Sequence, residues 1–240
     1  MSKASDMYEM SIVKQINLNE GFTATGGTSV KLSDVYITDF NGESSWLEVK
    51  MNHTDNLSNP RFFYDSHKWM TSYKTKAAEF GVKLLNESVD AAEFIRDIGH
   101  GHNIAIGTNK SHLKWDNVIS LGKMKSYFNQ DGVNRYIAIK KNVDLGRVVT
   151  DHYLYGKAEP AYYMQAGDDF YMIGDDNPLG LTDDIPALSG TGDYKVRVST
   201  RSSFYEVQAE IKIKDMPSSD YSLKPGTDKK SPLTRNITRK

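Results

Sequence analysis

Two carboxylates and one amine stand close together in the segment SDVYITDFNGESSWLEVKM, residues 33–51. Glu48 and Lys50 are two positions apart, so in a β-strand they project from the same face. The NGE run at 41–43 is a hairpin signal, and a hairpin would bring Asp34 beside Glu48. Two carboxylates suit a hard divalent cation such as Mg²⁺, and an adjacent lysine can orient a hydrolytic water. The alternative is an exposed cross-strand ion pair, worth ~0.2–1 kcal/mol.

A helix and two strands are expected to position these groups. Met7, Ile12, Val13 and Ile16 have the spacing of a buried helical stripe and predict a helix over 5–17, with Ser5 as its cap. Alternating apolar residues predict strands over 32–38 and 46–51, on either side of the hairpin turn, while the ATGGTSV run between helix and strand is expected to form a loop.

Glu9 is a further candidate for the site. It is spaced i+4 and i+7 from Val13 and Ile16, which places it inside the apolar stripe. A charge on a buried face is costly unless it is paired or binds a metal, so Glu9 has a reason to reach the same pocket. The alternative is that Glu9 sits at the edge of the stripe and reaches water.

In this order, the residues resemble the core motif of the PD-(D/E)xK nuclease superfamily, the restriction-endonuclease-like fold. That motif has an acidic helix residue, then a strand Asp, then (Asp/Glu)-x-Lys on the next strand. Asp34, Glu48 and Lys50 match the strand positions, Glu9 matches the helix position, and Ser33 stands where the family has Pro. The match covers roughly residues 5–52, or extends to residue 110 if the helices after the hairpin are counted, and says nothing specific about the β-rich half of the chain.

The resemblance implies a Mg²⁺-dependent DNA endonuclease of restriction or phage type, a phosphodiester hydrolase in which Mn²⁺ can substitute for Mg²⁺. Asp34, Glu48 and the backbone carbonyl of Val49 would ligate the metal, Lys50 would position the attacking water, and Glu9 would orient a water or Lys50. The partner would be DNA, and a homodimer is expected because two sites can then cut two strands.

The rest of the chain is expected to complete an α+β fold with a restriction-endonuclease-like core, a mixed sheet flanked by helices, and a β-rich C-terminal half. Helices are predicted at 66–80 and 88–98, followed by strands in the runs NIAIGT, NRYIAIKKN, RVVTDHYLYG, AYYMQAG, DFYMIG, YKVRVST and FYEVQAEIKI. The expected parts are a nuclease core over 1–110, a β-rich part over 111–218 that completes the fold or forms a DNA-binding subdomain, and a basic, flexible tail over 219–240.

Composition narrows the possibilities further. The chain has no cysteine, which excludes disulfide-linked partners, thiolate metal sites and cysteine nucleophiles. No run approaches the ~20 apolar residues of a membrane span, and the first residues lack the apolar region of a signal peptide, so a cytoplasmic protein without membrane partners is expected.

Several polar and basic side chains are predicted to contact nucleic acid, because they can pair with phosphates or read base edges. They are Asn56, Arg61, Lys68, Lys140, Lys141, Lys195, Arg197 and Arg201. Solvated loops, and lysines that protect strand edges from aggregation, would give the same pattern.

Two other functions remain open from the sequence. One is a non-catalytic DNA-binding or virion structural protein whose β-rich half supplies the function. The other is a structure-selective repair nuclease or an RNA-cleaving relative, which would share the site and differ in substrate.

Overall fold

The computed structural model of the chain describes residues 3–26, 34–99, 121–200 and 205–233. Helices and strands are both present in these ranges, and the strands form two five-stranded sheets, one of them mixed. The expected α+β class is therefore confirmed.

Two compact units make up the chain, and each is assembled from segments that are far apart in sequence. The first combines Met1–Asp55, Gly146–Thr191 and Ile213–Lys240, and the second combines Asn56–Leu145 and Gly192–Lys212. The expected boundaries at residues 110 and 218 instead follow chain order, because sequence periodicity does not reveal which distant strands pair.

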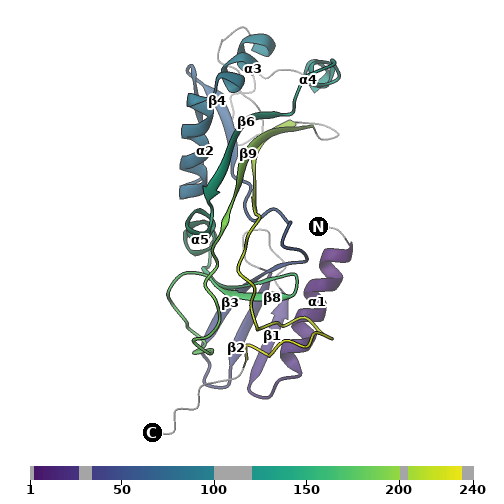
Figure 1. Cartoon of the computed structure of the whole chain (residues 1–240), viewed down its shortest axis with the longest axis vertical. Helices are drawn as coiled ribbons and strands as arrows, with labels where there is room; N and C mark the ends of the chain where they lie inside the picture. The colour runs from purple at the N-terminus through teal and green to yellow at the C-terminus, as the bar shows by residue number, and fades with distance from the viewer. Residues whose placement is uncertain (1–2, 27–33, 100–120, 201–204, 234–240) are drawn as a thin grey trace. The chain divides into compact units, whose positions relative to one another are not determined.

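The sheet of the first unit has the strand order β1-β2-β3-β7-β8. Figure 1 labels β1, β2, β3 and β8. Its strands are β1 (Phe22–Gly26), β2 (Val35–Asp39), β3 (Ser44–Lys50), β7 (Ala161–Ala166) and β8 (Asp169–Met172). Neighbours in β1, β2 and β3 are antiparallel, whereas β7 pairs with β3 in parallel and β8 runs antiparallel to β7. The two strands predicted around the hairpin are β2 and β3.

The turn between β2 and β3 is built by Asp39 and Gly42. Asp39 Oδ1 accepts hydrogen bonds from the N–H groups of Asn41 at 2.8 Å and Glu43 at 3.0 Å. Gly42 has a φ of 84°, which favours glycine. The predicted hairpin is confirmed, and this turn fixes the register that pairs the two strands.

Helices contact both faces of this sheet. Ile12 and Ile16 of α1 (Lys3–Asn17) share a buried core with Leu47 and Val49 of β3. Glu48 alternates with these residues and therefore faces the other side. There it meets α5 (Gly146–Tyr155).

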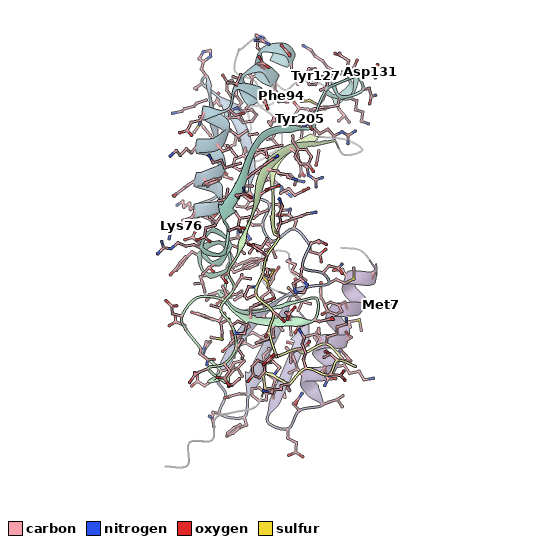
Figure 2. The ribbon with its side chains drawn as sticks, in the orientation of Figure 1. Met7, Lys76, Phe94, Tyr127, Asp131 and Tyr205 are labelled. Carbon is pink, nitrogen blue, oxygen red and sulfur yellow. The ribbon has the colours of Figure 1, made fainter. Side chains whose placement is uncertain are left out.

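The apolar stripe of α1 differs in one position from its prediction. Met7 is 62% exposed and lies on the outer side of the helix (Figure 2). Tyr8 packs against the core in its place, and its hydroxyl donates a hydrogen bond to the carbonyl of Gly167 at 2.6 Å. Ser5, the predicted cap, lies within the first turn of the helix.

The second unit has a sheet with the strand order β5-β4-β10-β9-β6. Its strands are β4 (Arg61–Asp65), β5 (Lys68–Met70), β6 (Tyr136–Asp144), β9 (Thr191–Thr200) and β10 (Tyr205–Ile213), and its helices are α2 (Lys76–Glu87), α3 (Val89–Gly99) and α4 (Leu121–Phe128). Phe94 of α3 and Tyr127 of α4 pack edge to face, with ring centroids 5.9 Å apart (Figure 2). Phe94 also stacks on Trp69 of β5, so the aromatic cluster joins these helices to the sheet.

The helix predicted over 66–80 is wrong for residues 66–75. Ser66 and His67 adopt positive φ angles in a tight turn between β4 and β5. Residues other than glycine rarely adopt this conformation, so the sequence does not predict the turn. The helix α2 begins only at Lys76, where Thr75 caps it by accepting a hydrogen bond from the N–H of Ala78.

The RVVTDHYLYG run forms the helix α5, so the predicted strand is wrong. Its β-branched and aromatic residues favour a strand locally, but Val149 and Tyr153 are buried at helical spacing. Phe22–Gly26 forms the strand β1, part of which was expected to be loop. The predicted NIAIGT strand lies outside the described residues, and the other predicted strands after residue 130 are confirmed.

The segment predicted to be a basic tail is partly built into the first unit. Tyr221, Leu223 and Leu233 are buried in the same core as α1. Residues 219–233 are therefore not a flexible tail, whereas residues 234–240 lie outside the described part of the chain. In the helices of the described ranges, no stretch has the length and apolar character needed to cross a bilayer.

A substitution of Gly81 in α2 tests how closely the second unit is packed. A Cβ atom added there would overlap the ring of Phe62 and the hydroxyl of Tyr194. Gly81→Ala is expected to destabilise the protein by about 1–3 kcal/mol through overpacking, and to lower Tm by about 2–4 °C per kcal/mol. Thermal unfolding followed by circular dichroism measures this change.

Gly122 of α4 provides the matched control. A Cβ there meets no atom within 4 Å, so Gly122→Ala is expected to leave Tm unchanged or raise it slightly. If the two variants melted at the same temperature, the close packing of α2 on Phe62 would be contradicted.

Candidate active site

Strand register brings Asp34 beside Glu48. Val35 is the Cα partner of Leu47, so extending the antiparallel pairing by one position sets Asp34 opposite Glu48. Asp34 Oδ2 also accepts a hydrogen bond from the N–H of Val49 at 2.8 Å. The two carboxylates therefore lie on one side of the sheet.

Glu48 and Lys50 form a close ion pair on β3. Lys50 Nζ is 2.5 Å from Glu48 Oε1. Glu48 is buried, with 2% of its surface exposed, while Lys50 is partly exposed at the end of the strand. Residues two apart on a strand share a face, so the pairing follows directly from the sequence spacing.

Glu9 approaches the same cluster from α1. It is partly buried, and its Oε1 accepts a hydrogen bond from Ser5 Oγ at 3.3 Å. Its charge interacts with those of Lys50 and Glu48. The structure thus brings Asp34, Glu48 and Lys50 together at β3 and the residue before β2, whereas Glu9 on α1 is related to them only by long-range charge interaction.

A second set of groups reaches Glu48 from α5 and the bend after it, and the sequence analysis missed this set. The Tyr153 hydroxyl is fully buried and hydrogen-bonds to Glu48, and Lys157 Nζ is 3.4 Å from Glu48 Oε2. His152 lies near the same carboxylate, and burial together with the charge of Lys157 lowers its pKa to about 4. The signal in the sequence is the helical periodicity of DHYLYGK. If this run is taken as a helix, His152 and Tyr153 fall on a different side from the exposed positions of the segment.

Charges on the two lysines decide the protonation of Glu48. Burial alone would raise its pKa, but Lys50 and Lys157 more than offset this effect, so the pKa of Glu48 lies below its ordinary value. The same attraction outweighs burial at Lys50 and raises the pKa of its amine. Glu48 is therefore ionised and Lys50 protonated at neutral pH.

Asp34 is the group that lacks charge compensation. Burial and the neighbouring charge of Glu48 raise its pKa to about 7, while Lys50 and the Val49 N–H offset only part of the rise. Burial likewise raises the pKa of Glu9. Additional positive charge beside Asp34 would favour its ionised form, and a divalent cation supplies such charge.

The donor set fits a hard cation that keeps much of its water shell. Within the described residues, no three His, Asp or Glu side chains are grouped closely enough to hold a metal alone. Asp34 and Glu48 offer two carboxylates, and Mg²⁺ is commonly bound through one or two carboxylates together with waters and substrate phosphates.

Four of the eight side chains predicted to contact DNA have partners within the second unit. Asn56 Oδ1 accepts a hydrogen bond from the Ile211 N–H at 2.7 Å, so its role there is structural. Arg61 pairs with Glu206 at 3.4 Å, and the remaining pairs are Lys195 with Asp193 at 3.8 Å and Arg197 with Glu210 at 3.3 Å.

Three of the predicted DNA contacts remain exposed on this unit. They are Lys68, Lys140 and Lys141. Arg201 lies outside the described residues. Contact of these side chains with DNA stays a prediction.

Comparison with known proteins gives no relative for this chain. No family model, no curated protein and no solved structure matches it.

Asp34→Asn tests the electrostatics of the site. Because the folded-state pKa of Asp34 is raised to about 7, the folded protein binds more protons than the unfolded chain above pH 4, and stability falls as pH rises towards 7. Asn keeps the oxygen that accepts from Val49 and removes the charge. In metal-free buffer at pH 8, Asp34→Asn is expected to unfold at least about 2–4 °C above wild type, corresponding to ~1 kcal/mol.

Melting curves from pH 4 to pH 8, with and without Mg²⁺, measure this effect. The advantage of Asp34→Asn should vanish near pH 4, and Mg²⁺ should stabilise wild type more than the variant. If the melting temperatures of the two proteins changed equally with pH, ionised Asp34 would not destabilise the folded protein.

Proposed function

We propose that the protein is a Mg²⁺-dependent DNA endonuclease of restriction or phage type, built on the PD-(D/E)xK plan. The single observation that carries the proposal is the cluster at β3, in which Lys50 pairs with Glu48 at 2.5 Å and Asp34 accepts a hydrogen bond from the Val49 N–H at 2.8 Å. Further support comes from Glu9 on the preceding helix and from the mixed sheet with helices against both faces.

Asp34 and Glu48 would hold the metal, and the backbone carbonyl of Val49 could add a ligand. Mg²⁺ bound there, or Mn²⁺ in its place, would neutralise charge on the phosphate oxygens. The raised pKa of Asp34 supports this assignment, because the ionised carboxylate is stabilised only when positive charge is added nearby.

Lys50 acts as a hydrogen-bond donor rather than as a base, because pairing with Glu48 keeps its amine protonated. Its ammonium orients the attacking water and stabilises negative charge on the phosphate. As the water oxygen bonds to phosphorus, it gives up a proton to solvent, the ester bond on the opposite side breaks, and the leaving oxygen takes up a proton from solvent. Tyr153 holds Glu48 in place during this step.

The main prediction is loss of DNA cleavage in Asp34→Ala and Lys50→Ala. Each variant is expected to lower the rate by at least about a hundredfold, since each removes a group that acts on the developing charge. Plasmid incubated with Mg²⁺ and analysed by gel electrophoresis measures the rate. Lys14→Ala, on an exposed position of α1, is the control and should cut like wild type.

Cutting that persists in both variants would remove the proposal. Absence of cutting by the wild-type protein on every substrate would favour the rival function, a non-catalytic DNA-binding or virion protein. Duplex, branched, single-stranded and RNA substrates assayed side by side separate the endonuclease from a structure-selective repair nuclease or an RNA-cleaving relative. Sedimentation tests the expected homodimer.

A further inference from the structure

His53 follows the end of β3 and is held by a buried carboxylate of β8. Its Nε2 lies 2.7 Å from Asp169 Oδ2, and the Tyr171 hydroxyl lies 3.5 Å from the same nitrogen. The ring also lies against Gly167, where an added Cβ would be 3.0 Å from ring atoms Cε1 and Nδ1. These contacts orient the imidazole, yet its side chain is 39% exposed, so a substrate can reach it.

Asp169 keeps the negative charge that orients this imidazole. Its Oδ1 accepts hydrogen bonds from Lys229 Nζ at 2.5 Å and from the Ser219 N–H at 2.7 Å. Burial alone would raise the pKa of Asp169, but these hydrogen bonds more than offset the effect, so its pKa lies below the ordinary value. An ionised carboxylate accepts a hydrogen bond from Nε2–H of His53, and Nδ1 is then the ring nitrogen that can act on a ligand.

Strand pairing places Asp169 on the sheet face that carries the proposed metal site. Lys50 of β3 is the Cα partner of Ala166 in β7, and Ala166 is the Cα partner of Asp169 in β8. Directly paired residues point to the same side of a sheet, so Asp169 projects from the face of Glu48 and Lys50. The Cα atoms of Lys50 and Asp169 are two strand spacings apart, roughly 10 Å. Ala166 contributes no more than a methyl group between them.

The order of these groups across the sheet matches the order of an in-line displacement. Asp34 and Glu48, the carboxylates that would hold the metal, lie at the residue before β2 and on β3, whereas His53 is held by β8. In such a displacement the attacking and leaving oxygens lie on opposite sides of the phosphorus. If the water attacks from the metal side, the leaving oxygen is on the side of His53.

We propose that His53, oriented by Asp169, is the general acid that protonates the leaving oxygen in place of solvent. This inference rests on the proposed function and deepens it. His53 enters the step as an imidazolium. As the ester bond breaks, its electron pair passes to the leaving oxygen, which takes the proton from Nδ1–H, and the neutral imidazole regains a proton from solvent. Asp169 is a positioning residue, because it contacts the imidazole and not the phosphate.

Two substrates that differ in their leaving group test this role. The alkoxide that leaves from DNA needs a proton, whereas the 4-nitrophenolate released from bis(4-nitrophenyl) phosphate leaves as a stable anion. With Mg²⁺ and protein in excess over plasmid, His53→Ala is expected to cut DNA about a hundredfold more slowly than wild type. On the aryl ester the loss should shrink to about threefold or less, since no proton transfer to the leaving group is needed.

Imidazole added to the buffer gives a second measurement. It can enter the space left by the side chain in His53→Ala and supply the missing proton, so DNA cleavage by this variant should rise about tenfold. His53→Gln fills that space and should not respond. The control is His67→Asn, at an exposed histidine of the second unit whose positive φ asparagine tolerates. This variant should match wild type on both substrates.

The outcomes separate this inference from the proposed function. Equal losses of His53→Ala on the two substrates, or DNA cleavage at the wild-type rate, overturn the role of His53 and leave the metal site standing. Wild-type protein that cleaves neither substrate overturns the proposed function and this inference with it. Circular dichroism checks that His53→Ala is folded. If it is not, His53→Gln, which keeps a hydrogen-bonding group beside Asp169 but cannot act as an acid, takes its place and should show the same difference between substrates.

Discussion

Compensation of the buried Glu48 carboxylate is the interaction on which this site depends. An ionised carboxylate with 2% exposure is unfavourable unless charges and hydrogen bonds surround it, and Lys50, Lys157 and Tyr153 supply them from two parts of the first unit. Well-packed apolar residues of similar volume would often be equally stable or more so. A charged cluster of this kind therefore points to function, and the raised pKa of Asp34 points in the same direction.

Strand pairing explains why the cluster draws on distant parts of the chain. β7 pairs with β3 in parallel, and a parallel neighbour needs a crossover connection. This connection contains the segment Asn56–Leu145 of the second unit and ends in α5, which brings Tyr153 and the bend carrying Lys157 to the face where Glu48 points. The hairpin supplies the carboxylates, and the end of the crossover supplies the groups that fix one of them.

Two arginines on the strands of the second unit are paired with carboxylates of the same unit. Arg61 and Arg197 face Glu206 and Glu210, so their positive charge is partly cancelled before any ligand arrives. These pairs join a partly exposed arginine to a buried carboxylate, and they reduce the field that would attract phosphates. Counting basic residues along the sequence therefore overestimates the DNA-binding potential of these strands.

Local sequence determined the hairpin, the α1 helix and the shared face of Glu48 and Lys50, because turn chemistry and the two-residue strand period are properties of neighbouring residues. It also placed Glu9 and Asp34 as candidates. It could not determine that RVVTDHYLYG is a helix, since β-branched residues favour strands until burial against a sheet outweighs that preference. Tertiary structure alone decided that Lys157 and Tyr153 meet Glu48, because the parallel pairing of β3 with β7 is set by contacts between residues far apart in the chain.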